Sequence, residues 1–372
     1  MKYLKVFYLL FLRLLPKTVK KQVTIVYLMS FSSNDGEVIQ RLAEKYSTDF
    51  LLFFTENNQL YAKKLAEKGV TILPYSQKQL LVHNGISYLK QAQVVVADNY
   101  FPELAILKPN KNRRIIQLWH AIGAVKTFGW EDSATLNRST SDQRRFQKVY
   151  DAFTDIVVSS EAMGQVFVNS WKAAPEVLRY LGFPKADLLV KQSIATQHGS
   201  SILYAPTYRE NSAAMMAVIE SAIQAFSQLS EQSFLLKLHP AVSIDKLVLP
   251  NNVALTKESL EQLFPQTEIL VTDYSASLFE FMVSRTNGKV IFFVPDLEIY
   301  KAMPGIQKEF LDYAPGPVTK TTEELTEVLN KNEFSSFEER AVQWGEQWNQ
   351  YNDGEAGKRV LALVDAGLGR IK

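Results

Sequence analysis

Short apolar runs alternate with amphipathic stretches from residue 22 onwards. The runs are rich in β-branched and aromatic residues and show no strict polar–apolar alternation, as in QVTIVYLMS at 22–30. Strands that are buried on both faces of a parallel sheet have this pattern, and the amphipathic stretches predict the helices that cover them. In the first half of the chain the expected strands are 22–30, 50–54, 70–73, 93–97, 114–119 and 156–159. The expected helices there are 37–45, 60–68 and 77–90.

The same rhythm starts again after KQSIATQHGS at 191–200, a segment with the composition of a linker or long loop. The expected strands are then 201–205, 234–238, 253–255, 268–272 and 290–294. The expected helices are 214–229, 260–264, 275–283 and 322–329, and an amphipathic helical stretch follows at 337–366.

This pattern predicts an α/β fold with two doubly wound, Rossmann-like domains that face a cleft. A length of 372 residues also suits about two domains. We expect the domains at 22–192 and 201–340, followed by a helical tail at 341–372. Ligands of such sheets bind outside the carboxyl ends of the strands, so the loops that follow strands should carry the chemistry.

The first 21 residues, MKYLKVFYLLFLRLLPKTVKK, have a different character. Six cations interrupt or flank the apolar residues, and the longest uncharged stretch, 6–12, is far short of the roughly 20 residues that cross a bilayer. No small-residue cleavage site of a secretory signal follows. We expect residues 1–21 to form an amphipathic helix that lies on an anionic membrane surface. A helix packed on the protein's own surface is the alternative.

Composition narrows the range of functions. Hydrophobic residues make up 47% and charged residues 22%, as in ordinary folded proteins. A net charge of +2, without a basic run interleaved with aromatics in the body of the chain, gives no support for a nucleic-acid partner. The absence of cysteine excludes disulfides, thiol nucleophiles and cysteine-ligated metals. The glycine-rich dinucleotide, P-loop, Gly-x-Ser-x-Gly and His-Glu-x-x-His motifs are also missing from the sequence.

Two of the four histidines stand where active-site loops are expected. His120 ends RRIIQLWH and His239 ends SFLLKLH, each at the end of an expected strand. Corresponding positions in two domains make a pair of histidines in the cleft plausible. His83, in an expected helix, and His198, in the expected linker, are interpreted as surface or capping residues.

Two other strand ends are candidates for binding phosphate. In VTDYSASLFEF at 271–281, the chain turns at Asp273–Ser275 from a strand into a helix, whose free N–H groups and hydroxyls can bind an anion. A helix cap with nothing bound is the alternative. In SILYAPTYR at 201–209, Arg209 follows a strand and can clamp a phosphate bidentately, unless it is a surface arginine.

Together these segments resemble the CDP-glycerol glycerophosphotransferase family of wall teichoic acid synthesis. The resemblance is close over about 117–321 and looser in the N-terminal third. Its marks, in order, are QLWHAIGAVKTFG (117–129), LGFPKADLL (181–189), ILYAPTYR (202–209), LKLHP (236–240), TDYSASLFEF (272–281), DLEIY (296–300) and APGPV (314–318). The family has the two-domain glycosyltransferase B architecture, which agrees with the two α/β halves.

The resemblance also implies roles for individual residues. The family's two essential histidines fall on His120 and His239, and its donor-phosphate stretch falls on 272–276. Ala276 replaces the second serine of that stretch, and Ser277 is a possible substitute. The expected substrate-binding residues are Gly123, Lys126, Thr207, Arg209, Thr272, Asp273, Ser275 and Ser277.

The implied reaction is attack by an acceptor hydroxyl on the glycerol-bearing phosphorus of CDP-glycerol, with CMP leaving. We expect His120, with a pKa near 6.5, to be the general base, and His239 to bind or protonate the leaving phosphate. Asp98, in VVADNYFPE at another strand end, is expected to orient His120 or to act as the base itself, with a turn cap as the alternative. No Asp-x-Asp motif occurs, so neither a cofactor nor an obligatory metal is expected.

The loop after His120, Ala-Ile-Gly-Ala, resembles the family's primases rather than its polymerases. Primases add the first glycerol phosphate to an undecaprenyl-diphosphate-linked disaccharide, which implies a peripheral enzyme at the cytoplasmic face of the membrane. The alternatives are a CDP-ribitol transferase or a polymerase of the same family, or a sugar-nucleotide glycosyltransferase of the same architecture.

Overall fold

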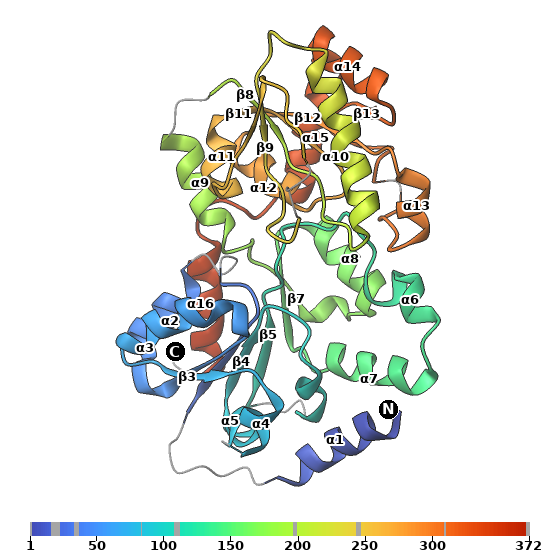
Figure 1. Cartoon of the computed structure of the whole chain (residues 1–372). Helices are drawn as coiled ribbons and strands as arrows, with labels where there is room; N and C mark the ends of the chain where they lie inside the picture. The colour runs from blue at the N-terminus through green and yellow to red at the C-terminus, as the bar shows by residue number, and fades with distance from the viewer. Residues whose placement is uncertain are drawn as a thin grey trace. The chain divides into compact units, whose positions relative to one another are not determined.

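The chain forms two compact units in the structure, which is a computed structural model. It describes residues 2–15, 23–32, 37–82, 84–107, 112–195, 199–242, 247–308 and 310–369, so His83 and His198 lie outside the described residues. The first unit comprises Met1–Ala121, Gly129–Leu188 and Tyr351–Lys372, and the second comprises Ile122–Phe128 and Leu189–Gln350. Each is an α/β unit around one parallel sheet, so the prediction of an α/β chain with two Rossmann-like domains is confirmed (Figure 1).

The sheet of the first unit has the strand order β3-β2-β1-β4-β5-β6-β7. All neighbouring strands are parallel, and every residue of β1 and β2 is buried. The strands are β1 (Ile25–Met29), β2 (Phe50–Phe54), β3 (Thr71–Pro74), β4 (Val94–Ala97), β5 (Arg114–Gln117), β6 (Asp155–Val158) and β7 (Leu178–Tyr180).

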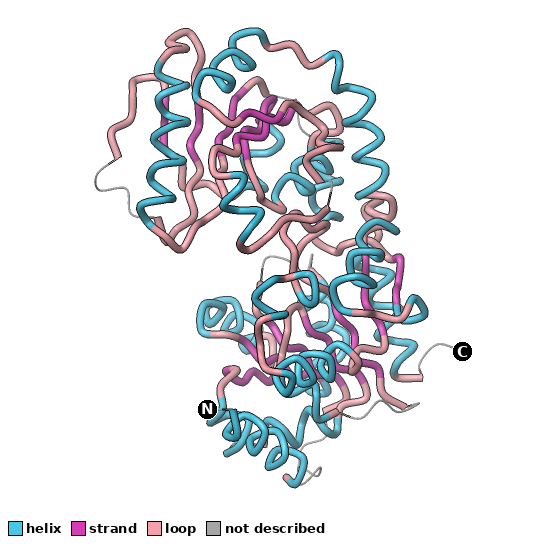
Figure 2. Tube along the Cα trace, turned by 90° about the vertical axis from the view of Figure 1, so that its right-hand side faces the viewer, coloured by secondary structure: helices cyan, strands magenta, loops and turns pink. Residues whose placement is uncertain are grey.

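Helices cover both faces of this sheet (Figure 2). They are α1 (Lys2–Leu14), α2 (Val38–Tyr46), α3 (Gln59–Glu67), α4 (Gln77–Val82), α5 (Gly85–Gln91), α6 (Ser133–Leu136), α7 (Thr140–Tyr150), α8 (Glu161–Trp171) and α16 (Ala356–Gly367). Helix α9 (Ala186–Ala195) begins in the first unit and ends in the second. Short 3₁₀ helices lie at η1 (Ser47–Asp49), η2 (Glu56–Asn58), η3 (Pro102–Ile106), η4 (Gly129–Glu131), η5 (Pro175–Val177), η6 (Phe264–Gln266) and η7 (Ser335–Phe337).

The second unit has the strand order β10-β9-β8-β11-β12-β13, again with all neighbours parallel. Its strands are β8 (Ser201–Tyr204), β9 (Phe234–Leu236), β10 (Val253–Leu255), β11 (Thr267–Thr272), β12 (Lys289–Phe293) and β13 (Val318–Thr319). Its helices are α10 (Ser212–Ser227), α11 (Leu260–Leu263), α12 (Ser277–Ser284), α13 (Leu297–Ala302), α14 (Thr322–Lys331) and α15 (Glu338–Trp348).

The strand order reverses once in each sheet. The reversal lies between β1 and β4 in the first unit and between β8 and β11 in the second. On either side of such a switch point the crossover connections run to opposite faces of the sheet, which leaves a crevice at the carboxyl ends of the two central strands. The strand order therefore points to one candidate site in each unit.

The predicted helical tail is divided between the two units. Helix α15 belongs to the second unit, whereas α16 belongs to the first, where Val360 and Val364 pack with Leu42 of α2 in one hydrophobic core. The boundary differs again at Ile122–Phe128, a segment expected in the N-terminal domain that belongs to the second unit. For α16 the apolar side chains decide which core the segment joins.

Several local expectations need correction. The helix expected at 77–90 is two helices, and α9 runs into the first half of the expected linker. Strands β7 and β13 and helices α6, α7, α8 and α13 were not predicted. Among them, β7 buries only its first residue fully and α7 is mostly polar, so neither has the continuous apolar signal of the central strands. No helix in the described part of the chain is long and apolar enough to cross a membrane.

Gly316, in the APGPV segment, lies against the backbone of β12. A Cβ at this position would be 1.8 Å from the carbonyl oxygen of Val290, so Gly316→Ala must displace one of the two segments. We expect the free energy of unfolding to fall by about 1–3 kcal/mol, the usual range for overpacking. Gly345→Ala in α15 meets no atom within 4 Å and should instead add up to about 1 kcal/mol through helix propensity. Denaturant unfolding of both variants tests this, and equal effects would contradict it.

Candidate functional site

His120 lies beside the switch point of the first unit, just after β5. Its ring contacts two aromatic side chains: the ring centroid of Trp119 is 4.1 Å away and that of Phe31 is 4.7 Å away. Its Nδ1 is 3.2 Å from the backbone carbonyl oxygen of Asp98. Because a carbonyl only accepts hydrogen bonds, the hydrogen of the neutral ring is on Nδ1, and Nε2 carries the lone pair.

The backbone next to His120 has an unusual conformation. Trp119 has a φ of 62°, which is strained for a bulky side chain and persists only where its surroundings enforce it. Its N–H donates to Oε1 of the fully buried Gln117 at 2.8 Å, and its indole packs edge-on against Phe167 and Trp171. The orientation of the His120 ring is therefore fixed by core packing as well as by its own hydrogen bond.

The same packing changes the acid–base behaviour of His120. Burial lowers its pKa to about 4, although the hydrogen bond to Asp98 opposes this shift. The structure thus corrects the value near 6.5 that was expected from the sequence. Near neutral pH the imidazole is uncharged and Nε2 is able to take a proton.

Asp98 acts through two different groups. Its carboxylate, 1% exposed, accepts hydrogen bonds from the backbone N–H groups of Ser30 (2.8 and 2.9 Å) and Phe31 (2.8 Å). Its backbone carbonyl contacts His120. Of the two roles expected for Asp98, this geometry favours orienting His120 over acting as a base, because the carboxylate is engaged in holding the loop after β1.

His239 follows β9 in the second unit and is exposed. The backbone N–H of Ala241 donates to its Nδ1 at 3.2 Å, so in the neutral ring the hydrogen is on Nε2. The ring lies 5.0 Å from that of Tyr208. The local hydrogen bond therefore leaves His239 with a donor at Nε2, the opposite of His120.

The switch point of the second unit is organised by the buried carboxylate of Asp273. Its Oδ1 accepts hydrogen bonds from the N–H groups of Thr207 (2.8 Å) and Tyr274 (2.6 Å). The hydroxyl of Thr272 donates to the carbonyl of Ala205 at 2.8 Å. Thr272 and Asp273, both expected to bind substrate, thus join the loops after β8 and β11. The side-chain hydroxyl of Thr207 is buried and has no hydrogen-bond partner among the described residues.

Arg209 is a buried residue rather than a surface arginine. Its guanidinium makes a bidentate contact with Asp296 (2.6 and 3.0 Å), an ion pair with Asp273 (2.9 Å) and a hydrogen bond to the carbonyl of Thr207 (2.6 Å). Burial lowers the pKa of Arg209, but its hydrogen bonds and the charges of the two aspartates raise it above the usual range. Asp273 and Asp296 therefore already balance the positive charge of the guanidinium that was expected to clamp a phosphate.

Lys126 reaches the second unit on the segment 122–128, called the strap below. The strap pairs antiparallel with the segment after α13: Thr127 N–H donates to the carbonyl of Gly305 at 3.1 Å, and Gln307 N–H donates to that of Val125 at 2.8 Å. A Cβ on Gly123 would lie 2.3 Å from the ring of Phe279, so this glycine permits close packing on α12.

The ammonium of Lys126 is half-buried and lies 5.6 Å from the ring centre of Tyr300. Burial lowers its pKa, which the charge of Asp273 opposes and that of Arg209 reinforces. No carboxylate in the described ranges is within ion-pair distance of this ammonium. Among the expected phosphate contacts, Lys126 therefore has a cationic group that is still available.

Helix α12 begins two residues later than expected, at Ser277. The hydroxyls of Ser275 and Ser277 are 2.8 Å apart, and Ser277 N–H donates to Ser275 Oγ at 3.2 Å. The expected phosphate-binding turn therefore has a local cap, with Ser275 half-buried at the carboxyl end of β11.

Three residues complete this region that lie within the motifs of the resemblance but were not singled out as site residues: Tyr274, Asp296 and Tyr300. Asp296 holds Arg209 and accepts a hydrogen bond from the Tyr274 hydroxyl at 3.1 Å, and the rings of Tyr274 and Tyr300 stack at 3.7 Å. Asp296 follows β12, so the strand-end argument applied to His239 would have found it. The two tyrosines lie in motifs of the resemblance, TDYSASLFEF and DLEIY, but no local pattern distinguishes their side chains from core residues.

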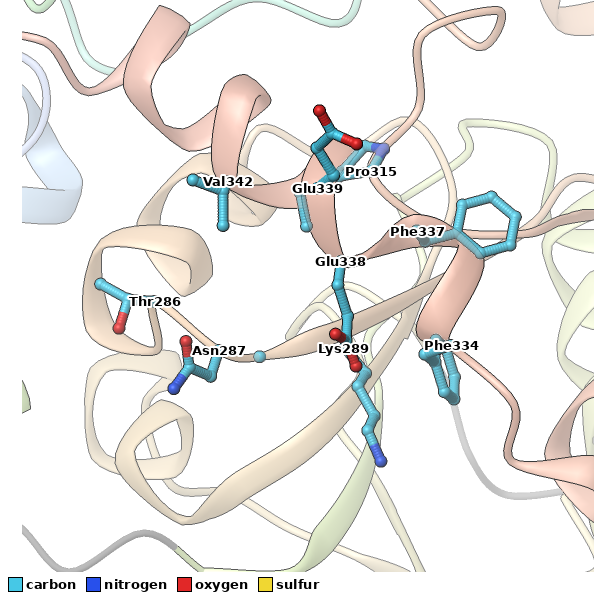
Figure 3. Close-up of a pocket in the computed structure, with 11 residues that line it drawn as sticks. Thr286, Asn287, Lys289, Pro315, Phe334, Phe337, Glu338, Glu339 and Val342 are labelled. Atoms are coloured by element: carbon cyan, nitrogen blue, oxygen red, sulfur yellow. The ribbon is translucent and has the colours of Figure 1, made fainter.

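A cavity of about 500 Å³ lies at the opposite, amino-terminal edge of this sheet (Figure 3). Lys289 at the start of β12 and the turn at Thr286 and Asn287 line it together with Glu338 and Glu339 of α15. The Lys289 ammonium is paired with Glu268 at 2.8 Å, so the lining is net acidic. Such a lining does not suit a pyrophosphate, and the carboxyl edge remains the candidate donor site of this unit.

Comparison with known proteins agrees with this architecture. Residues 8–366 match the sequence profile of the CDP-glycerol:poly(glycerophosphate) glycerophosphotransferase family. The chain is 27% identical over 360 residues to the teichoic acid glycerol-phosphate primase of Bacillus subtilis (strain 168), covering 93% of each protein. It is 26% identical to the enzyme of that name from Staphylococcus aureus (strain NCTC 8325 / PS 47), covering 97% of this chain and 98% of the relative.

Among solved structures, the wall teichoic acid polymerase TagF in its H548A form superposes with a TM-score of 0.71. The match is 17% identical in sequence and covers 99% of this chain and 98% of that one, so it supports the fold alone. The profile match spans nearly the whole chain and confirms the resemblance seen in the sequence. This chain belongs to the CDP-glycerol:poly(glycerophosphate) glycerophosphotransferase family.

Proposed function

We propose that this enzyme transfers glycerol phosphate from CDP-glycerol to an undecaprenyl-diphosphate-linked disaccharide, releases CMP, and so primes wall teichoic acid synthesis. Family membership supports the donor and the type of reaction. Similarity to two glycerol-phosphate primases over more than nine-tenths of the chain, and the Ala-Ile-Gly-Ala loop at 121–124, support a primase.

In this mechanism His120 is the general base. Its Nε2 takes the proton of the acceptor hydroxyl, whose oxygen forms a bond to the glycerol-bearing phosphorus while the bond from phosphorus to the CMP oxygen breaks. His239 donates from Nε2 to that leaving oxygen. The observation that carries this assignment is the opposite hydrogen bonding of the two Nδ1 atoms, which leaves an acceptor on His120 and a donor on His239.

We assign the cationic contact with the donor phosphates to Lys126 and a positioning role to Arg209. The transition state of phosphoryl transfer spreads negative charge over the phosphoryl oxygens, so a cation without a carboxylate partner stabilises it most. Thr207 and Ser275 lie on loops at the same edge of the sheet, where Ser277 begins α12, and the three side chains supply hydroxyls. Helix α1 would bring the enzyme to the cytoplasmic face of the membrane, where the lipid-linked acceptor lies.

A product assay tests the proposal as a whole. The purified enzyme should release CMP from CDP-glycerol only when a short-chain lipid-linked disaccharide is present, and should add a single glycerol phosphate to it. Mass spectrometry of the products, with CDP-ribitol and UDP-sugars as alternative donors, measures both. Ribitol addition, repeated glycerol phosphate addition or sugar transfer would each replace the proposal with a different activity.

His120→Ala should fold normally and lose at least about a hundredfold in turnover, the lower end for a general base. In the wild type, kcat/KM should fall as pH decreases through about 4, because burial lowers the pKa of His120 and protonation below that value removes its lone pair. Above about pH 4, the acidic side of the pH profile of kcat/KM (its acidic limb) should be flat. His239→Ala serves as the control: it should also lose turnover but keep the acidic limb. Near-wild-type turnover of His120→Ala would disprove the assignment.

Lys126→Met should raise KM for CDP-glycerol about tenfold to a hundredfold, the usual range for a charged hydrogen bond, with little change in stability. Arg209→Ala should instead destabilise the fold by about 3–5 kcal/mol, because it leaves Asp273 and Asp296 buried without their partner. Donor kinetics and denaturant unfolding of both variants separate the two roles. A large rise in KM with unchanged stability in Arg209→Ala would restore the phosphate-clamp hypothesis.

A further inference from the structure

Helix α1 is held against the first unit in a fixed orientation. Leu12 is fully buried, and the hydroxyl of Tyr8 donates to Glu103 at 2.9 Å. The Arg13 guanidinium donates to the carbonyl of Ala105 at 3.2 Å, and the ammonium of Lys90 donates to the carbonyls of Arg13 (3.0 Å) and Leu15 (2.7 Å). Because these contacts fix the rotation of the helix, they also decide which of its side chains face outward.

The outward side chains form an apolar stripe. Phe7, Leu10, Phe11 and Leu14 are exposed by 68%, 49%, 52% and 83%. Their spacing of three, four and seven residues puts them on one face of the helix. Each aromatic or leucine side chain left in water forgoes the free energy of burial, so four on one face indicate a surface that becomes covered.

Helix α7 lies next to α1 (Figure 1), and side chains of both helices line one pocket. Ser141, Arg144, Arg145 and Lys148 share one face of α7 through the same spacing. With Leu9, Leu10, Arg13 and Ala105 they line a pocket of about 190 Å³. The pocket has four cations and no carboxylate in its lining.

The charges of this pocket are only partly neutralised. Arg145 pairs with Asp142, but its Nη1 is buried without a hydrogen-bond partner among the described residues. Arg144 and Lys148 are exposed and form no ion pair within the described ranges. The pocket therefore keeps a positive potential and unused N–H donors directly beside apolar side chains.

We propose that this pocket binds the phosphate of an anionic membrane lipid while the stripe of α1 enters the acyl-chain region. At about 30 Å³ per water, 190 Å³ accommodates roughly six water-sized groups, enough for a phosphate of five heavy atoms and part of its ester. A soluble anion would satisfy the cations but leave the stripe in water. A lipid surface satisfies both, since its phosphate and its acyl chains are covalently joined.

This inference rests on the proposed function only in placing the enzyme at a membrane, and it needs no donor to be tested. The full chain is mixed with vesicles of phosphatidylcholine alone or with added phosphatidylglycerol, and bound protein is measured by sedimentation. Arg144→Gln/Lys148→Gln should weaken binding to the anionic vesicles about 25-fold, or about fivefold per cation. Added salt should weaken wild-type binding in the same direction.

Lys63→Gln/Lys64→Gln on α3 is the matched control, because it removes the same charge from two exposed lysines elsewhere in the unit. It should bind nearly as the wild type does. Phe7→Ser/Phe11→Ser should weaken binding to both kinds of vesicle. Equal losses in the two charge variants, unchanged binding of Arg144→Gln/Lys148→Gln, or release from vesicles by equimolar inorganic phosphate would overturn the proposal.

Transfer to a water-soluble acceptor analogue separates this inference from the proposed function. Arg144→Gln/Lys148→Gln should retain that activity, because neither residue belongs to the donor or histidine sites. Loss of vesicle binding with full transfer supports the lipid-phosphate pocket. If Arg144→Gln/Lys148→Gln binds anionic vesicles as tightly as the wild type, the lipid-phosphate pocket is disproved, even where the enzyme has the proposed transferase activity.

Discussion

A buried aspartate directly after one central strand holds together the switch point of each unit. Asp98 follows β4 and accepts hydrogen bonds from the backbone N–H groups after β1. Asp273 follows β11 and accepts one from the backbone N–H after β8. The two aspartates occupy equivalent positions, because the six-stranded sheet repeats the order of the first six strands of the seven-stranded sheet. A carboxylate that is removed from water needs such donors, so each pair of loops is fixed relative to its sheet.

The two units then use this framework differently. In the first unit, the hydrogen bond to the carbonyl of Asp98 leaves Nε2 of His120 as an acceptor, and burial lowers the pKa of this histidine. In the second, Asp273 and Asp296 neutralise Arg209, and the available cation arrives on the strap as Lys126. The uncharged imidazole of the proposed base His120 and the ammonium of the proposed donor contact Lys126, unpaired among the described residues, are consistent with the proposed transfer of a phosphoryl group between two hydroxyl oxygens.

The strap also connects the proposed base to the proposed donor contact along the chain. His120 and Lys126 are six residues apart, yet His120 belongs to the first unit and Lys126 to the second. Backbone hydrogen bonds to Gly305 and Gln307 hold the strap, and Gly123 allows it to pack against Phe279. The motif that carries the proposed base therefore also carries the proposed donor contact.

The sequence by itself determined the parallel sheets and the positions of both histidines at strand ends. Runs such as IVYLM and FLLFF are recognisable as buried strands from the sequence alone. Their hydrophobic pattern and composition are properties of neighbouring residues in the chain. Only the tertiary structure decided that Arg209 pairs with a carboxylate 87 residues away, and that His120 is buried and contacts Phe31. It also brought the polar helix α7 beside α1. Charge balance, desolvation and the pairing of surfaces depend on groups that are distant in the chain, and no local pattern encodes them.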